Sequence, residues 1–304
     1  IKIGVIAIAI GMIVMIISVG VGYGMQKEIK DKISSFESHI TIQSFNNSIN
    51  ENSINPISPE LNFIDDLKSI PEVKSIERII SKFGVVRTAQ DFDGLYFKGL
   101  DKDYDFSRIK KYIIDGNTPL FSDNFSNDVL ISKTLADKLD LKLNESFQML
   151  FSKTENLNPS ILKLVVVGIY DSGFEELNSK FIFGDIKQIR RISKWKENQI
   201  SSLEIQLYKQ RDLESISEFI YLNSPSDLDV VTVKEKYYSV YEWIELFDKN
   251  IYAIIFIMIL VASVNIISVL LVLILERTNM IGILKALGVS NKSLQKFFIY
   301  TSSY

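Results

Sequence analysis

Two long apolar runs constrain this chain more than any other feature. Residues 3–26 and residues 250–275 contain no charged side chain. A helix that crosses the hydrocarbon core of a bilayer, about 30 Å thick, needs about 20 apolar residues. Both runs reach this length, so the sequence predicts transmembrane helices over residues 1–25 and 249–275.

These runs have two other interpretations. Either run could be a buried core helix, and the first could be a cleaved signal peptide. The first run has no cleavage site of the A-x-A type, however, and it contains four glycines, small residues that let membrane helices approach closely: Gly11, Gly20, Gly22 and Gly24. Crossing helices therefore fit both runs better.

The segment after the second run is rich in basic residues. Its charged side chains are one acid and four bases: Glu276, Arg277, Lys285, Lys292 and Lys296. Lys and Arg in short loops stay on the cytoplasmic side of a membrane. We therefore expect residues 276–296 in the cytoplasm and residues 26–248 on the opposite side.

Both ends of the chain suggest a fragment. The chain opens on Ile1 instead of Met, and it closes shortly after a new apolar start at Phe297. We expect residues 297–304 to be the truncated start of a third transmembrane helix, with further helices beyond.

The region between the two runs reads as a folded domain. Its predicted strands are residues 38–42, 73–88, 96–100, 128–132, 164–169, 203–207 and 230–233, and its predicted helices are residues 61–70, 134–139, 185–193 and 213–222. The fold class expected is an α-helical membrane protein with a mixed α+β extracytoplasmic domain between its first and second transmembrane helices. Acidic residues outnumber basic ones in this region, which argues against nucleic acid as a partner.

Residues suited to catalysis or metal binding are scarce. The chain has no cysteine, and its one histidine, His39, has no partner at metal-ligand spacing, so we interpret it as structural or exposed. Lys292-Ser293 lacks the two-glycine spacing of a phosphate loop. The sequence predicts no catalytic, metal or cofactor site in this chain.

Aromatic side chains have more ordinary interpretations. Phe181 and Phe183 are expected in the core, and Tyr237 to Trp243, just before the second run, are expected in an aromatic belt at the headgroup level. Asn265 is the main polar residue inside the second run, and we expect it to hydrogen-bond between helices.

The segment ERTNMIGILKALG follows the second run directly. Met280, Ile283, Leu284 and Leu287 recur at helical spacing, and Gly288 is placed to end the helix in the left-handed region. An apolar stripe on a short helix suits either the headgroup layer of a membrane or the groove of a partner protein. Periodicity alone leaves both open.

The pattern E-R-x-x-x-I-G-I-L-K-A-L-G resembles the coupling region of permeases of the FtsX and MacB-like class of ABC transporters. This resemblance implies that the short helix docks on a separate ATPase, which binds ATP and Mg²⁺, and that the chain itself is not catalytic. The docking residues that it implies are Glu276, Arg277, Met280, Ile281, Gly282, Ile283, Leu284, Lys285, Leu287 and Gly288. The family often has an acid at the position of Met280, so a charged contact from that position is not expected here.

Further segments are similar to lipoprotein-releasing permeases of the LolC/LolE type. They are residues 18–42, 129–141, 166–173 and 261–268, although Asn144-Glu145 replaces the usual Gly-Asp turn. This similarity implies a multi-pass protein of the bacterial inner membrane with lipoprotein cargo, a periplasmic carrier and a second permease copy or related permease. MacB-like efflux or peptide export, FtsX-like control of a cell-wall hydrolase and a two-span sensor are the alternatives.

The domain organisation expected is therefore transmembrane helix 1–25, periplasmic domain 26–248, transmembrane helix 249–275, coupling helix and loop 276–296, and the start of a third span at 297–304. In such a permease, cargo would meet the first span. Helical spacing places four apolar residues on one face of it: Ile10, Ile13, Ile17 and Val21.

Overall fold

The computed structural model describes residues 2–49, 54–88, 91–152, 158–294 and 296. These residues form two compact units. The helical unit consists of Ile1–Glu28 and Ser239–Tyr304, and the mixed unit consists of Ile29–Tyr238. The predicted third span, residues 297–304, lies outside the described residues.

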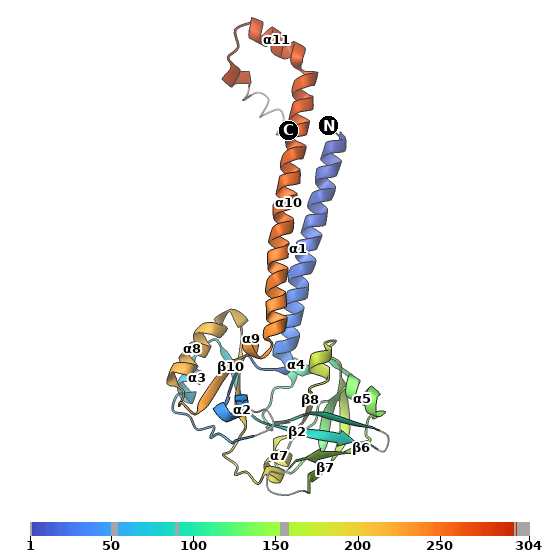
Figure 1. Ribbon diagram of the computed structural model, residues 1–304, viewed down its shortest axis with the longest axis vertical. Coiled ribbons are helices and arrows are strands. Elements are labelled where there is room, and N and C mark those ends of the chain that lie inside the picture. The colour runs from blue at the N-terminus through green and yellow to red at the C-terminus, as the bar shows by residue number, and fades with distance from the viewer. Residues whose placement is uncertain (1, 50–53, 89–90, 153–157, 295, 297–304) are drawn as a thin grey trace. The chain divides into compact units, whose positions relative to one another are not determined.

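Three helices make up most of the helical unit: most of α1 (Lys2–Phe36), nearly all of α10 (Tyr238–Glu276), and α11 (Thr278–Ala286). Helices α1 and α10 lie side by side in this unit (Figure 1), where the Gln26 amide donates to Asp248 Oδ1 at 2.9 Å. A Cβ on Gly22 would lie 2.8 Å from the Ile251 side chain, so glycine permits the close approach of the helices there.

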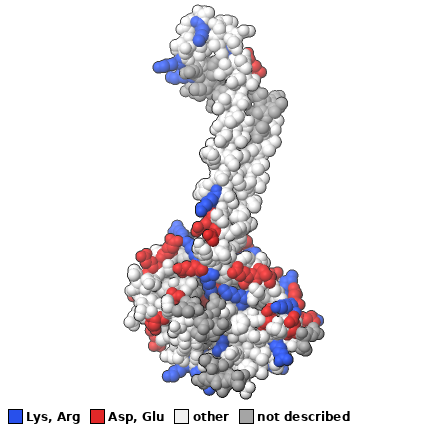
Figure 2. All heavy atoms as spheres, in the orientation of Figure 1, with Lys and Arg blue, Asp and Glu red and all other residues white. Residues whose placement is uncertain are grey.

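The two long helices have the length and composition of membrane spans. The candidate spans are Ala9–Phe36 and Tyr238–Ser268. Their apolar side chains are largely exposed, and Figure 2 shows these helices almost free of charge over most of their length. Such a surface is stable in hydrocarbon and costly in water.

The mixed unit contains a ten-stranded sheet in which most neighbours are antiparallel. The path is β10-β1-β9-β2-β3-β8-β5-β7-β4, and β6 pairs with β2 and β7. The β3/β8 and β5/β7 pairs are parallel. The strands are β1 (Ile40–Ser44), β2 (Val73–Arg87), β3 (Phe92–Leu100), β4 (Ile113–Gly116), β5 (Asp128–Ser132), β6 (Ser146–Phe151), β7 (Ser160–Tyr170), β8 (Phe181–Asp185), β9 (Ser202–Leu207) and β10 (Leu228–Thr232).

Short helices connect these strands, and local capping explains where several begin. The Ser132 hydroxyl accepts from the Leu135 amide, and the Asp185 carboxylate accepts from the Lys187 amide. The helices are α2 (Phe45–Ile49), α3 (Ile64–Ser69), α4 (Ser107–Lys110), α5 (Lys133–Leu139), α6 (Glu175–Asn178), α7 (Ile186–Ser193), α8 (Leu213–Asn223) and α9 (Val233–Lys236), with a 3₁₀ turn at Gln210–Asp212.

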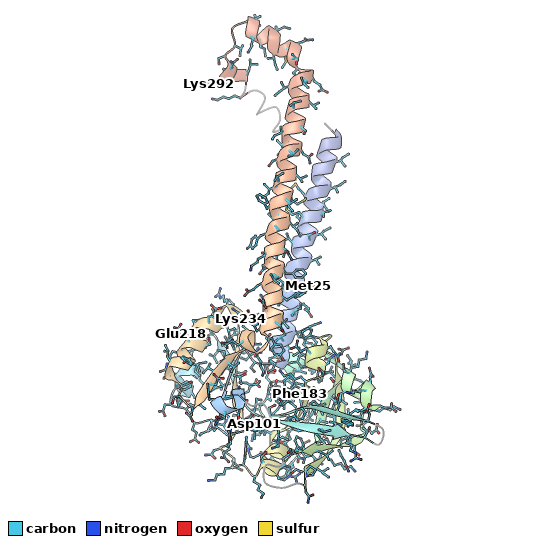
Figure 3. All side chains as sticks on the ribbon, in the orientation of Figure 1. Met25, Asp101, Phe183, Glu218, Lys234 and Lys292 are labelled. Atoms are coloured by element: carbon cyan, nitrogen blue, oxygen red, sulfur yellow. The ribbon has the colours of Figure 1, made fainter. Side chains whose placement is uncertain are left out.

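The last turns of α1 belong to the mixed unit and enter its core. Phe36, the last residue of α1, is buried with its ring centroid 5.0 Å from that of Tyr170 and 6.2 Å from that of Phe183. Figure 3 shows Phe183 inside this unit. Phe181 is buried too, so the core interpretation of these two aromatics is confirmed.

The structure has the expected mixed α+β region between two long apolar helices. Each predicted strand and helix of this region overlaps an observed one, and β5 has the predicted bounds. Strands β4, β6 and β8 and the short helices α2, α4, α6 and α9 were not predicted. The aromatic-belt interpretation is wrong for Tyr237, which is buried in the mixed unit, where its hydroxyl donates to Glu37.

Candidate functional site

The transition from α10 to α11 is stabilised by local hydrogen bonds. Helix α10 ends at Glu276, and the Thr278 hydroxyl donates to the Leu275 carbonyl at 2.8 Å. The Ile281 amide then donates to the Arg277 carbonyl at 3.0 Å and begins the new helix. Because Thr278 satisfies a carbonyl at the end of α10, the chain can turn here without leaving that carbonyl unpaired.

The end of α11 is a Schellman motif. The Gly288 amide donates to the Lys285 carbonyl and the Val289 amide donates to the Leu284 carbonyl, both at 3.0 Å. Gly288 has a φ of +86°, as its predicted role as a left-handed stop requires. Helix α11 is therefore a defined element of about two turns, and Lys292 lies in the segment that follows it (Figure 3).

The predicted apolar stripe of α11 is exposed along one edge, which we call the open edge. Ile283 is 63% exposed and Leu287 is 75% exposed, whereas Met280 and Leu284 are half-buried. Ile283 and Leu287 lie four residues apart, so they are neighbours on the helix surface. The half-buried side also contains Ile281, and the remaining predicted docking residues are exposed: Glu276, Arg277, Gly282, Lys285 and Gly288.

The residues predicted to form a cargo face on α1 are all exposed. Ile17 and Val21 line a hollow of about 310 Å³ between α1 and α10, with Ile251 and Ile254 on its other side. Ile10 and Ile13 are not among its lining residues. Asn265 on α10 is half-buried.

A group of charged side chains lies in the mixed unit around the buried Glu37 carboxylate, and its outer members Lys180 and Lys236 are partly exposed. We call it the Glu37 cluster, and its members are Glu37, Lys98, Lys180, Glu204, Lys236 and Tyr237. Glu37 and Lys98 are each 1% exposed. They come from widely separated parts of the chain: Glu37 follows α1, Lys98 is on β3, Lys180 precedes β8, Glu204 is on β9, and Lys236 and Tyr237 precede α10.

Four donors or cations surround the Glu37 carboxylate. Lys236 Nζ donates to Oε2 at 2.8 Å, Lys180 Nζ donates to Oε1 at 3.2 Å, and the Tyr237 hydroxyl donates to Oε1 at 3.1 Å. Lys98 Nζ lies 3.7 Å from Oε2. Such charge-assisted bonds in a buried site are strong, and they offset the cost of removing the carboxylate from water.

Lys98 joins Glu37 to the centre of the sheet. Its Nζ lies 2.8 Å from Glu204 Oε1 and donates to the Phe36 carbonyl at 3.2 Å. The Ser38 hydroxyl donates to Glu204 Oε2 at 2.8 Å. A cation at the last carbonyl of α1 is also favourable for the helix dipole.

Electrostatics keep the centre of this cluster ionised. Burial acts to raise the pKa of Glu37, but the charges of Lys236, Lys180 and Lys98 outweigh it and hold that pKa well below its ordinary value. Burial acts to lower the pKa of Lys98, but Glu204 and Glu37 outweigh it and raise that pKa. At neutral pH, Glu37 is therefore a carboxylate and Lys98 an ammonium.

A second buried ion pair lies in the same unit. Arg108 on α4 donates to Glu77 Oε2 on β2 at 2.6 Å and to Gln206 Oε1 at 2.7 Å. Gln206 in turn donates to the Ser34 carbonyl of α1 at 3.3 Å. Side chains from strands β3 and β9 thus bind two carbonyls of the last turn of α1.

His39 is a structural residue, as its sequence context predicts. It is buried, and its Nδ1 accepts from the Leu207 amide at 3.2 Å. Burial lowers the pKa of His39 to about 4 from its ordinary 6.5, because the charged form would be desolvated and would lose this acceptor.

We expect His39 to make stability depend on pH between 6.5 and 5. In that window the unfolded chain binds a proton at this residue and the folded chain does not, so stability falls by about 2 kcal/mol as the pH falls. The His39→Asn variant keeps an acceptor for Leu207 but does not titrate, so its stability should change less. Chemical unfolding of both proteins at pH 6.5 and pH 5 measures how much stability each loses between the two pH values. An equal loss in the two proteins would contradict the assignment.

Sequence reasoning missed the Glu37 cluster. The available signal was a charge inside an otherwise apolar strand, as at Lys98 in YFKGL and at Glu204 in SLEIQL. Buried lysine and glutamate are rare unless they are paired. Among the residues that the structure describes, no group of three His, Cys, Asp or Glu side chains could hold a metal ion.

Comparison with known families covers nearly the whole chain. A model of the MacB-like periplasmic core domain matches residues 3–220, and a model of the FtsX-like permease C-terminal region matches residues 252–303. The lipoprotein-releasing system transmembrane protein LolE of Haemophilus influenzae is 21% identical over 98% of this chain and 72% of its own length. LolC of Neisseria meningitidis is 20% identical over 98% of this chain and 71% of its own length.

Solved structures with some likeness include two domains of transporters. The extracellular domain of the ABC-type transporter YknZ from Gram-positive bacteria is 18% identical, with a TM-score of 0.40 over 64% of this chain and 99% of that domain. The periplasmic region of MacB from Actinobacillus actinomycetemcomitans is 13% identical, with a TM-score of 0.41 over 66% of this chain and 91% of that region.

Proposed function

This chain belongs to the MacB-like and FtsX-like family of ABC transporter permeases, and from that membership we propose that it releases lipoproteins from a bacterial inner membrane. The lipoproteins would pass to a periplasmic carrier. The observation that supports this cargo most is the similarity to LolE and LolC, which extends over 98% of this chain in both cases.

The proposed topology follows from the apolar helices and the charges. Helices α1 and α10 cross the inner membrane, and the mixed unit lies in the periplasm. The basic residues after α10 keep α11 in the cytoplasm. With two crossing helices the protein would be multi-pass, and a second copy or a related permease would complete the transporter.

In this proposal a separate ATPase subunit binds ATP and Mg²⁺ and docks on α11. The open edge of the helix, Ile283 and Leu287, offers two apolar anchors four residues apart, a spacing that suits a groove on a partner. Glu276 and Arg277 are exposed at the root of the helix. Met280 supplies no charge, so the contact is mainly apolar.

Cargo would be held by apolar surface on α1. The hollow beside Ile17 and Val21 is almost wholly apolar in its lining, which suits an acyl chain better than a polar group. Gly22 lets Ile251 approach the floor of this hollow. Ile10 and Ile13 extend the same face of α1 outside it.

Depletion of this protein in its own bacterium tests the proposal. We expect outer-membrane lipoproteins to accumulate in the inner membrane fraction as the protein is lost, before growth stops. Normal lipoprotein sorting together with drug sensitivity would favour MacB-like efflux or peptide export. Normal sorting together with a division defect would favour an FtsX-like transmitter that controls a cell-wall hydrolase.

A further inference from the structure

The two chain segments that connect the mixed unit to the long helices lie next to each other. Strand β1 follows α1 and pairs antiparallel with β10, which precedes α10, from Ile40↔Thr232 to Ser44↔Leu228. One further bond, from the Val233 amide to the His39 carbonyl at 2.9 Å, extends this ladder. Beyond it, backbone pairing between the two segments ends among the described residues.

Beyond the end of the ladder, contacts of the Glu37 side chain connect the segment after α1 to the segment before α10. Glu37 is the first residue after α1, and its partners Lys236 and Tyr237 are the last residues before α10. These bonds therefore join the two segments immediately next to the helices. The carboxylate and Tyr237 are buried, whereas the side chain of Lys236 is partly exposed.

The same carboxylate is connected to the interior of the sheet. Lys98 on β3 lies between Glu37 and Glu204 on β9, and it also holds the Phe36 carbonyl. Strands β3 and β9 both neighbour β2 at the centre of the sheet. One set of ion pairs thus connects both helix ends to two inner strands.

A cavity next to the cluster gives these side chains room to change partners. It has a volume of about 300 Å³, and its lining includes Glu37, Lys98, Lys180, Glu204 and Lys236. A side chain at a cavity can move without displacing packed neighbours, unlike a side chain in a close-packed core. Well-packed apolar residues would often be as stable as buried ion pairs, so stability alone does not explain the cluster.

We infer that Glu37 is a positioning residue that couples the ends of α1 and α10 to the central strands, so that movement of the helices reaches the mixed unit. This inference rests on the proposed function, in which a partner ATPase drives the helices. Lys236 is the residue through which Glu37 acts on α10, and Lys98 is the residue through which it acts on the sheet. If Glu37 had only a structural role, it would stabilise the mixed unit, and replacing it would not change the response of that unit to ATP.

The test uses the full-length protein with its ATPase in lipid nanodiscs. Amide hydrogen exchange in β3 and β9 is measured with and without MgATP, alongside ATP hydrolysis. We expect MgATP to change exchange in these strands of the wild type. Glu37→Gln and Lys236→Met should reduce this change by about 2-fold to 30-fold, the range of effects seen for residues that carry coupling, while ATP hydrolysis continues.

Two control variants separate coupling from stability. Lys236→Arg keeps the cation beside Glu37 and should keep the response to ATP. Asp185→Ala removes a buried carboxylate that accepts from the Ser126 and Lys187 amides, which belong to neither long helix, so it should lower stability and leave the response intact.

A full response in Glu37→Gln would overturn the inference, as would an equal loss in Asp185→Ala or no response in the wild type. Exchange does not depend on the identity of the cargo. An intact response in a protein that fails to sort lipoproteins would therefore count against the proposed function alone.

Discussion

Replacing Lys98 with methionine is expected to destabilise the protein by about 3–5 kcal/mol, because it leaves the buried Glu204 carboxylate without its cation. Lys98 Nζ lies 2.8 Å from Glu204 and 3.7 Å from Glu37, and all three side chains are at most 5% exposed. Methionine has a similar length and fills the site, so the loss of stability comes from removing the charge. Urea unfolding of the full chain in detergent, followed by circular dichroism, measures the change.

A second substitution provides the control for Lys98→Met. Glu204→Gln, added to the same protein, removes the carboxylate that the first change leaves without a cation. The double variant should therefore be more stable than Lys98→Met alone. A loss of less than about 1 kcal/mol for the single variant, the value typical of exposed pairs, would show that the cluster is solvated.

An aspartate at Leu287 or at Ile283 is expected to break the contact between α11 and the ATPase. Each substitution places a charge on the open apolar edge of the helix, where the two side chains are 75% and 63% exposed. The loss of one central anchor should weaken binding by about 2 kcal/mol or more, which is about 30-fold. Co-purification and the ATPase stimulation of the purified complex measure it.

Asn279→Asp is the matched control for these variants. Asn279 is exposed on the same helix but is not part of the apolar stripe, so the variant adds the same charge elsewhere. We expect it to retain the ATPase. If it lost the ATPase as fully as Leu287→Asp did, a general effect of charge would replace the docking explanation.

The structure refines which residues of the stripe this experiment should use. Periodicity makes Met280, Ile283, Leu284 and Leu287 equivalent, since all lie on one face of a helix. The fold separates them, because Met280 and Leu284 are half-buried in the helical unit. Substitution of Leu284 would disturb that packing as well as the docking surface, so the open pair is the sharper choice.

Elements with strong local signals could be predicted from the sequence. Strand β5 and helices α5 and α7 have clear apolar patterns and caps at Ser132 and Asp185, and they form as expected. Strand β6 alternates too, in SFQMLF, and could have been predicted, whereas strand β4 lacks such a signal. Ile114 on β4 is exposed, and IIDG has no alternating pattern, so its pairing with β7 depends on tertiary contacts.

The Glu37 cluster could not be predicted, because its members are distant in sequence. Glu37 and Lys236 lie about 200 residues apart, and only the pairing of β1 with β10 brings them together. Tyr237 illustrates the same limit. Its position just before an apolar run is typical of a residue at the membrane interface, yet its hydroxyl bonds a buried carboxylate.

Reconstitution tests the proposed release of lipoproteins most directly. The full-length permease, its ATPase and a lipoprotein are placed in proteoliposomes with a soluble lipoprotein carrier outside, and MgATP is added. We expect the lipoprotein to appear on the carrier only with MgATP, and Leu287→Asp to prevent its release. Stimulated ATP hydrolysis with the lipoprotein still in the vesicles would contradict the proposed function.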